Sequence, residues 1–192
     1  AFKIGSGECN NLPLIKHVAK KGKPMILSTG MNDIVSIRES VKIIQSYSCP
    51  LVIMHCTSMY PTPYSKVRLG AITHLQNEFP SIPIGLSDHS LGIATCLGGV
   101  ALGACVFEKH VGVPTSNYPL NAYSCSPNQY FKWLEAFSYA MKVCGEGSQR
   151  LPLNENEQAS LQSLRRGVFA RNEIEAGQNI SIEDLYKKEN RS

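Results

Sequence analysis

Residues 82–110 read IPIGLSDHSLGIATCLGGVALGACVFEKH, and this stretch decides the fold. Apolar runs at 82–87 and 105–110 lie at its two ends, and neither run alternates polar with apolar residues. Such runs are typical of strands that are covered on both faces, as in a parallel sheet. Between them, apolar side chains recur at helical spacing: Ile93, Leu97, Val100 and Ala101. The stretch therefore predicts a strand–helix–strand unit.

The same unit recurs on both sides of this stretch. Apolar runs at residues 2–5, 25–28 and 51–56 precede it, and an amphipathic helical pattern follows every run. The helical patterns each present one apolar face, and they cover residues 12–19, 34–44, 72–79, 93–101 and 131–141. Alternating strands and helices of this kind predict (βα) architecture with a parallel sheet.

The way in which the sheet closes is indicated by the residues that end each predicted strand. A doubly wound dinucleotide-binding sheet would show a Gly-rich first turn, and residues 5–8 (GSGE) are too short a match to it. Every predicted strand ends instead in polar side chains, as in a (β/α)₈ TIM barrel. Because the units are fewer than eight, we expect a barrel fragment with about the last five βα units.

Three regions are expected along the chain. Residues 1–147 form the partial barrel, and the polar residues 148–163 are interpreted as a linker. Residues 164–192 contain a short strand, a turn at Gly177 and a capped start at Ser181, which predict the opening of a second small domain. This region is too short to build a core of its own.

Composition excludes several classes of function. The net charge of +4 is modest and spread along the chain, which argues against a nucleic-acid or charged-membrane partner. No apolar run reaches the roughly 18 residues of a membrane-spanning helix. Seven cysteines occur without a Cys-x-x-Cys pair, which favours a reducing cytoplasm over a disulfide framework. Without an initiator Met, the N-terminus is interpreted as a cut or processed end.

Two histidines are the candidate metal ligands. His89 and His110 end successive predicted strands, so a barrel would place them side by side at one rim. Two neutral imidazoles can hold a divalent cation there, with water and a carboxylate such as Glu108 completing or orienting the shell. The alternative is that each imidazole merely hydrogen-bonds a loop. His17 and His74 fall on predicted helices and are expected at the surface.

Small hydroxyls form the second candidate group. Ser6, Ser28 and Ser87 each lie at the end of a predicted strand, and Lys3 lies close to the first of them. Hydroxyl groups and free backbone N–H groups beside a lysine suit a phosphate, because each donates a hydrogen bond to an anionic oxygen. Each serine taken alone is more typical of a turn residue. Their recurrence at three strand ends favours the phosphate site.

Two further residues suit a sugar. Glu8 lies just past the first strand, where a carboxylate can transfer a proton or hold a sugar hydroxyl; its alternative role is that of a negative charge at a helix N-terminus. Tyr60 opens the rigid loop Tyr-Pro-Thr-Pro-Tyr, which is suited to lining a sugar pocket and equally to packing at the surface.

Four segments together resemble consecutive blocks of the N-acetylneuraminate (sialic acid) synthase family: FKIGSGECNNLPLIKHVAKKGKPMILSTGM, HCTSMYPTPY, IPIGLSDHSLGI and ALGACVFEKH. The tail RRGVFARNEIEAGQNISIEDL resembles the start of the C-terminal antifreeze-like (SAF) domain of that family. The resemblance covers nearly the whole chain. It implies a (β/α)₈ barrel whose fourth to eighth strands lie here, in a domain-swapped homodimer when full length.

The resemblance also implies a reaction and its residues. His89 and His110 match the ligands of a Mn²⁺-type ion, with Mg²⁺ as the other candidate, and His110 is also assigned to catalysis. Lys3, Ser6, Ser28 and Ser87 match phosphoenolpyruvate contacts. The positions near the sugar and the reacting carbons are Glu8, also expected to be catalytic, and Tyr60. The implied reaction joins C3 of phosphoenolpyruvate to the aldehyde of N-acetylmannosamine and releases phosphate.

The chain departs from the family pattern after its last predicted strand. Most relatives carry an acidic sugar-binding residue there, whereas residues 111–124 read VGVPTSNYPLNAYS. Asn121 is the nearest substitute, and its amide can hydrogen-bond a sugar hydroxyl but cannot take a proton. The departure leaves the sugar open, including the amino-sugars that lead to pseudaminic or legionaminic acid.

Alternatives from other classes remain. One is a divergent, non-catalytic relative that binds a sugar or regulates a partner. Another is a metal-dependent aldolase that does not use phosphoenolpyruvate. Because the first three strands are absent from this chain, the fragment alone is expected to be inactive.

Overall fold

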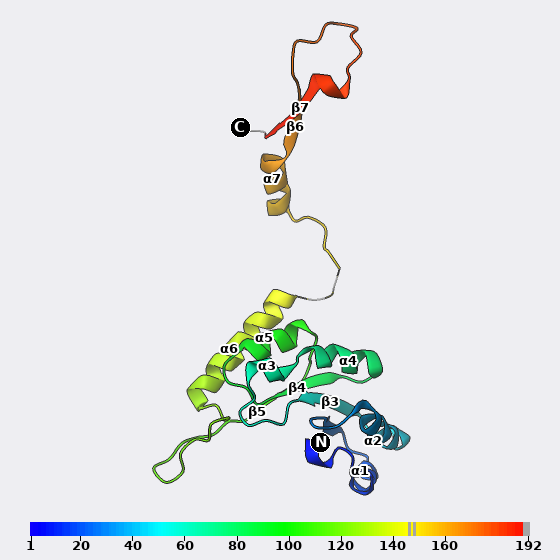
Figure 1. The fold of residues 1–192 in the computed structure, drawn as a ribbon, viewed down its shortest axis with the longest axis vertical. Helices are drawn as coiled ribbons and strands as arrows, with labels where there is room; N and C mark the ends of the chain where they lie inside the picture. Colours follow the sequence, from blue (N-terminus) through cyan, green and yellow to red (C-terminus); the bar gives the residue numbers. More distant parts are fainter. Residues whose placement is uncertain (146, 148, 190–192) are drawn as a thin grey trace. The chain divides into compact units, whose positions relative to one another are not determined.

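The computed structural model describes residues 1–145, 147 and 149–189 (Figure 1). The chain divides into two compact units, Ala1–Gly145 and Glu146–Ser192. As far as the described residues go, none of the helices has both the length and the apolar character that crossing a bilayer requires.

The first unit is built on a parallel sheet. Its strands follow one another in the same order in sequence and in space: β1 (Phe2–Ile4), β2 (Met25–Ser28), β3 (Leu51–Cys56), β4 (Ile84–Asp88) and β5 (Phe107–Lys109). Each neighbouring pair is parallel, which confirms the predicted sheet. β4 begins after Pro83 rather than at Ile82, because a proline has no N–H to give to the ladder.

Helices follow the strands, and the sequence explains where several of them begin. They are η1 (Ser6–Glu8), α1 (Leu12–Ala19), α2 (Ile34–Ser46), α3 (Tyr64–Val67), α4 (Gly70–Glu78), α5 (Ala94–Ala101) and α6 (Pro127–Cys144). The side chains of Asn11 and Asp33 accept N–H groups of the first turns of α1 and α2. In α6, Ser126 and Gln129 accept each other's backbone N–H. These caps satisfy donors that have no partner within the helix.

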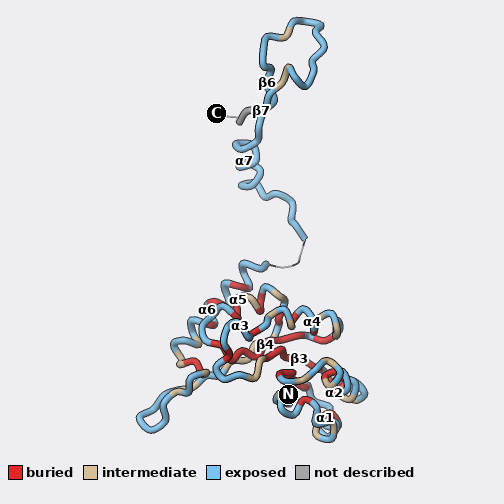
Figure 2. Tube along the Cα trace, in the orientation of Figure 1, coloured by how far each residue is buried: buried red, intermediate tan, exposed pale blue. Residues whose placement is uncertain are grey.

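The core lies between the sheet and the helices that cover its outer face. Figure 2 shows the buried residues concentrated in the strands and in the helix faces turned toward them. Fully enclosed side chains include Ile15, Leu27, Ile44, Ile53, Ile72 and Leu86. Burying one such side chain stabilises the fold by about 1.5–3 kcal/mol, so this layer holds the strands in place.

The sheet is strongly curved. β1 and β5 are its two edge strands, and in a flat sheet they would lie roughly 19 Å apart. Lys3 on β1 nevertheless forms an ion pair with Glu108 on β5, with Nζ 3.2 Å from Oε2. Two side chains can meet in this way only if the sheet curls around them. The first unit is therefore a parallel half-barrel, and Lys3 and Glu108 lie on its inner face.

The second unit contains α7 (Glu155–Leu164), β6 (Arg166–Ala170), η2 (Ile182–Asp184) and β7 (Leu185–Glu189). β6 and β7 pair antiparallel. None of residues 149–186 is buried, and Figure 2 draws this part of the unit almost entirely as exposed. Because it lacks a core, packing within the unit contributes little to its stability.

α7 occupies residues 155–164, so most of the range 148–163 is helical, and its role as a linker stays a prediction. Asn154 accepts the backbone N–H of Glu157, and the Glu157 carboxylate accepts that of Asn154. This capping box starts a helix in a polar segment that has few apolar residues to signal one. Residues 149–154 precede the helix without regular structure.

Candidate active site at the strand ends

The inner face of the half-barrel gathers four polar side chains from four strands. The Lys3 ammonium donates to Ser28 Oγ at 2.8 Å and to Glu108 Oε1 at 3.3 Å. The Ser87 hydroxyl donates to the same Glu108 oxygen at 2.7 Å. The predicted group of Lys3, Ser28 and Ser87 therefore does come together, and Glu108 joins it.

The Glu108 carboxylate is ionised at neutral pH. Burial alone would raise its pKa, but the hydrogen bond from Ser87 and the charge of Lys3 outweigh burial and hold the pKa below its usual value. Glu108 therefore serves as the counter-ion of Lys3. The sequence-based expectation placed this carboxylate in or around a metal shell, and its observed partners are instead the amine and the hydroxyl.

Ser6 lies in a second polar group, next to the end of β2. Its Oγ accepts the backbone N–H of Gly30 at 3.0 Å and lies 2.9 Å from Cys56 Sγ. Gly30 is required here, because a Cβ on it would collide with Ser58 Oγ and lie 2.8 Å from Cys56 Sγ. The Ser58 hydroxyl is buried and has no hydrogen-bond partner. Such an orphaned donor points to a ligand.

The two predicted metal ligands lie side by side. The ring centroids of His89 and His110 are 5.2 Å apart. His89 Nδ1 lies 3.1 Å from the carbonyl oxygen of Thr57, so the tautomer that donates from Nδ1 keeps a free lone pair on Nε2. Burial lowers the pKa of His89, and the nearby His110 lowers it further. A neutral imidazole held through its other nitrogen is the form that binds a metal ion.

The two imidazoles fit a divalent cation as a pair of ligands. Within the described ranges, no set of three or more His, Cys, Asp or Glu residues is arranged to hold a metal ion. The alternative role, in which each histidine only bonds a loop, accounts for His89 Nδ1 but leaves the pairing of the two rings unexplained.

Two tyrosines stand against the histidines. The Tyr60 ring centroid lies 4.4 Å from that of His89 and 6.1 Å from that of His110, and its place in a sugar pocket stays a prediction. The ring centroid of Tyr123 lies 5.1 Å from that of His110 and 5.2 Å from that of Tyr60. Sequence reasoning missed Tyr123, because it lies in a loop; its only signal was an aromatic residue shortly after the last strand.

Asn121 and Glu8 are more loosely connected to this centre. Asn121 is exposed, and its side-chain oxygen accepts the backbone N–H of Tyr123 at 3.2 Å. Glu8 is exposed in η1, and its carboxylate accepts the Asn11 amide at 2.6 Å. Neither side chain bonds the other predicted site residues in the described part of the chain. Their roles in sugar binding and proton transfer stay predictions.

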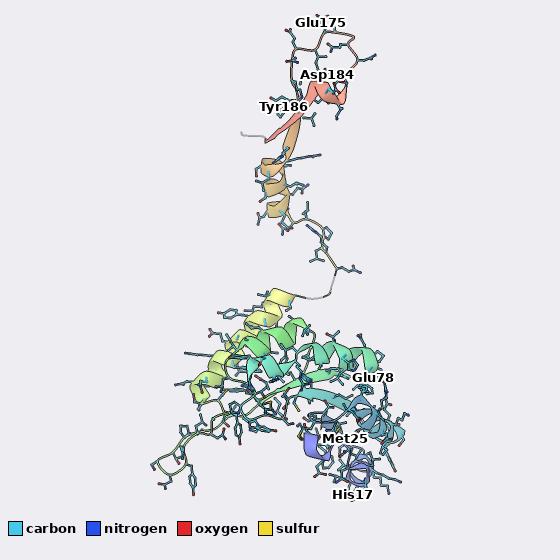
Figure 3. All side chains as sticks on the ribbon, in the orientation of Figure 1. His17, Met25, Glu78, Glu175, Asp184 and Tyr186 are labelled. Carbon is cyan, nitrogen blue, oxygen red and sulfur yellow. The ribbon has the colours of Figure 1, made fainter. Side chains whose placement is uncertain are left out.

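The histidines on helices lie away from the strand ends. His17 and His74 are both exposed, on α1 and α4, and Figure 3 shows His17 on the outside of its helix. His55 is buried inside β3, and its Nε2 lies 2.8 Å from the carbonyl oxygen of Val67. None of the three therefore belongs to the metal pair.

Comparisons with known proteins agree with this geometry. A family model described as the NeuB family matches residues 1–149. The N,N'-diacetyllegionaminic acid synthase of Legionella pneumophila is 37% identical over 190 residues, which cover 96% of this chain and 52% of that protein. The N-acetylneuraminate-9-phosphate synthase of Mus musculus is 33% identical over 189 residues, which cover 97% and 52%.

A solved structure has the same fold. It is the N-acetylneuraminic acid (sialic acid) synthetase of Leptospira borgpetersenii in complex with citrate, which is 32% identical and superimposes with a TM-score of 0.75. The match covers 83% of this chain and 55% of that one. The chain thus spans about half the length of the curated relatives it matches.

Proposed function

We propose, since the chain belongs to the NeuB family, that its complete protein condenses phosphoenolpyruvate with an amino-sugar aldehyde and releases phosphate. The product is a nonulosonic acid of the sialic acid type. The observation that carries the proposal is the convergence of Lys3, two serine hydroxyls and two imidazoles at neighbouring strand ends.

The proposed binding of phosphoenolpyruvate rests on the polar side chains of the inner face, which are Lys3, Ser28, Ser87 and Glu108. The Lys3 ammonium and the hydroxyls of Ser28 and Ser87 are donors suited to carboxylate and phosphate oxygens. The Glu108 carboxylate accepts hydrogen bonds from the Lys3 amine and from the Ser87 hydroxyl, and it thereby holds these two groups close together. Ser6, whose Oγ accepts the Gly30 N–H, and the Ser58 hydroxyl beside it add further hydroxyl donors. Together they orient phosphoenolpyruvate before the aldehyde arrives.

The reaction balances with water as the third reactant. C3 of phosphoenolpyruvate forms a bond to the aldehyde carbon, whose oxygen becomes a hydroxyl. Water adds at C2, the C2–O bond to phosphate breaks, and the 2-keto acid and inorganic phosphate remain. His89 and His110 would hold the divalent cation, Mn²⁺ or Mg²⁺, which polarises the aldehyde oxygen as a Lewis acid when bound. Glu8 is proposed for proton transfer.

The sugar substrate is proposed to bind against Tyr60 and Tyr123. Tyr60 and Tyr123 offer ring faces and hydroxyls beside the two imidazoles, and Asn121 offers an amide on the same loop as Tyr123. The substrate is N-acetylmannosamine or a related amino-sugar of the legionaminic or pseudaminic type. The relatives are named for different products of this kind, so the choice among the sugars lies in these contacts.

Three features of the complete protein complete the proposal. Residues 164–192, with the β6–β7 pair, begin an SAF domain. The assembly is a domain-swapped homodimer. The location is the cytoplasm, where the seven free thiols of the chain stay reduced.

The test uses the protein expressed from its complete reading frame. Phosphate release from phosphoenolpyruvate is measured with Mn²⁺ or Mg²⁺ and, separately, with N-acetylmannosamine and the legionaminic- and pseudaminic-type sugars. We expect release to need one of the sugars, and His89→Ala or His110→Ala to lower kcat at least a hundredfold. The matched control, His74→Ala on the exposed face of α4, should leave kcat unchanged. Unaltered release in both site variants would overturn the metal assignment.

A second candidate, a sugar-binding relative without turnover, is favoured by the loss of the acidic residue in 111–124. Calorimetric titration with the sugar and with phosphoenolpyruvate separates the two candidates. Binding of both ligands without phosphate release would support the second candidate and reject the synthase.

A further inference from the structure

A buried ion pair lies behind the two imidazoles, on the face of the sheet that the helices cover. Lys109 Nζ lies 2.7 Å from Asp88 Oδ2, and the two side chains are 1% and 2% exposed. Thr95 of α5 donates to the same carboxylate oxygen at 2.6 Å, which places the pair between the sheet and α5. Nothing in the reaction proposed above uses these two charges.

The pair lies in a dense network of hydrogen bonds. Asp88 Oδ1 accepts the backbone N–H of Ser90 at 2.8 Å and its hydroxyl at 2.6 Å. The Lys109 ammonium also donates to the Ser90 carbonyl. Buried charges lose their contacts with water, so a buried ion pair needs close hydrogen-bond partners in the protein. Asp88 and Lys109 both have such partners, which hold the two side chains in one geometry.

The position of the pair relates it directly to the metal ligands. Asp88 immediately precedes His89, Lys109 immediately precedes His110, and Asp88 and Lys109 are register partners in the β4–β5 ladder. Successive side chains of a strand point to opposite faces. A link between Asp88 and Lys109 on the helix side therefore fixes the two backbones at the points from which the imidazoles leave toward the inner face.

Stability alone is a weak reason for such a pair. Replacing a buried ion pair by uncharged residues of similar volume is often neutral or stabilising, whereas removing only one partner is strongly destabilising. We propose that the Asp88–Lys109 pair positions His89 and His110, setting the spacing and tautomer with which the two imidazoles receive one divalent cation. This inference rests on the metal role assigned under the proposed function.

The test removes both charges together, because a single substitution would leave a buried charge without its partner. The variant is Asp88→Asn/Lys109→Met in the complete protein. The matched control is Arg38→Met/Glu78→Gln, which removes a more exposed ion pair between α2 and α4. Three quantities are measured for each protein: the Tm, the affinity for Mn²⁺ from the electron paramagnetic resonance signal of the free ion, and the imidazole ¹⁵N shifts of the metal-free protein.

We expect the double variant to fold with a Tm close to that of the wild type, and to bind Mn²⁺ at least tenfold more weakly, in line with the loss of groups that orient metal ligands. In the metal-free spectra, the His89 signals should change from one tautomer, with the proton on Nδ1, to a mixture. The control should retain both the affinity and the spectra, since its ion pair touches neither strand end.

A double variant that folds, binds Mn²⁺ within twofold of the wild type and keeps its imidazole signals would overturn the inference. If that variant does not fold, Thr95→Val removes only one hydrogen bond to Asp88 and is judged by the same two readouts. A wild type that binds no Mn²⁺ would contradict the metal assignment instead, and the metal-free spectra would still decide whether the pair positions the rings.

Discussion

Lys3 illustrates how strongly a single charge here depends on its neighbours. Its ammonium bonds a hydroxyl on the next strand and a carboxylate on the far edge of the sheet. The side chain is about one third exposed, so water still reaches it. An ammonium held in this way is oriented while remaining open to an incoming anion, which is the property that a phosphate-binding lysine needs.

Replacing Lys3 should weaken binding of phosphoenolpyruvate. Lys3→Met keeps much of the side-chain length and removes the charge, so we expect the Kd to rise about tenfold to a hundredfold, as loss of a charged hydrogen bond of about 1.5–3 kcal/mol implies. Isothermal titration with phosphoenolpyruvate measures the change. Lys16→Met, on the exposed face of α1, is the control. A Kd within twofold of the wild type for Lys3→Met would remove Lys3 from the site.

Buried His55 should make folding stability depend on pH. Burial lowers its pKa below the ordinary value of about 6.5, so under acidic conditions the unfolded chain takes up a proton that the folded chain refuses. The free energy of unfolding should therefore be unaffected by His55 above pH 6.5 and fall by on the order of 1 kcal/mol per pH unit just below it. His89, with its lowered pKa, acts in the same direction.

Urea unfolding at pH 7.5, 6.5 and 5.5 measures this slope. His55→Gln can still donate to the Val67 carbonyl but does not titrate, so the slope should be shallower in this variant. His74→Gln, at an exposed position, should keep the wild-type slope. An unchanged slope in His55→Gln would show that His55 is not the titrating group.

At the scale of elements, α6 is attached to β5 by aromatic rings. Trp133 lies edge-on to Phe107 of β5, with ring centroids 5.9 Å apart, and stacks on Phe137 one turn along α6 at 6.0 Å. The Trp133 side chain is buried, and its Nε1–H has no hydrogen-bond partner among the described residues. Ring packing, and not a hydrogen bond from the Trp133 indole, therefore holds this part of α6 against β5.

Two substitutions at Trp133 should separate the contribution of ring packing to stability from that of the unpaired indole N–H. Trp133→Ala should lower the free energy of unfolding by about 3–5 kcal/mol, because it leaves a cavity against Phe107. Trp133→Phe keeps an aromatic ring and removes the unpaired donor, so we expect a change below about 1.5 kcal/mol. Denaturant titration measures both. Equal losses in the two variants would mean that the indole N–H, and not the ring area, decides the contact.

The elements themselves were predictable where burial decides them. The central strands β2 and β3 are dense apolar runs, since both faces of a parallel sheet are covered, whereas β5 has two charged residues out of three. The limits appear where local hydrogen bonds decide. α7 begins at the capping box of Asn154 and Glu157 in a polar segment, and α3 is a single short turn without an apolar stripe.

At the scale of the whole molecule, the two units differ in what holds them. Residues 149–154 lie near the start of the second unit, exposed and outside any helix or strand. Trypsin should therefore cut early after Arg150, whereas Lys109, whose side chain is 1% exposed, should resist until the first unit unfolds. Mass spectrometry of a time course identifies the cuts. A first cut inside β4–β5 would contradict the stability assigned to the half-barrel.

Topology also explains how much of the site could be foreseen. Parallel strands bring their C-terminal ends to one rim, so His89 and His110, or Lys3 and Ser28, follow from strand order alone. The residue with which a charged side chain pairs cannot be predicted from strand order. Asp88 and Lys109 look like ordinary polar residues at strand ends, and only side-chain direction reveals that they pair behind the sheet.

The ion pair between β1 and β5 has a consequence for the translation of the chain on the ribosome. Its two residues are separated by 105 positions, so a ribosome finishes the lysine long before the glutamate exists. Throughout that interval the nascent chain has the ammonium but not the carboxylate that will orient it. The contact that joins the two edge strands of the half-barrel is thus completed only after β5 has been made.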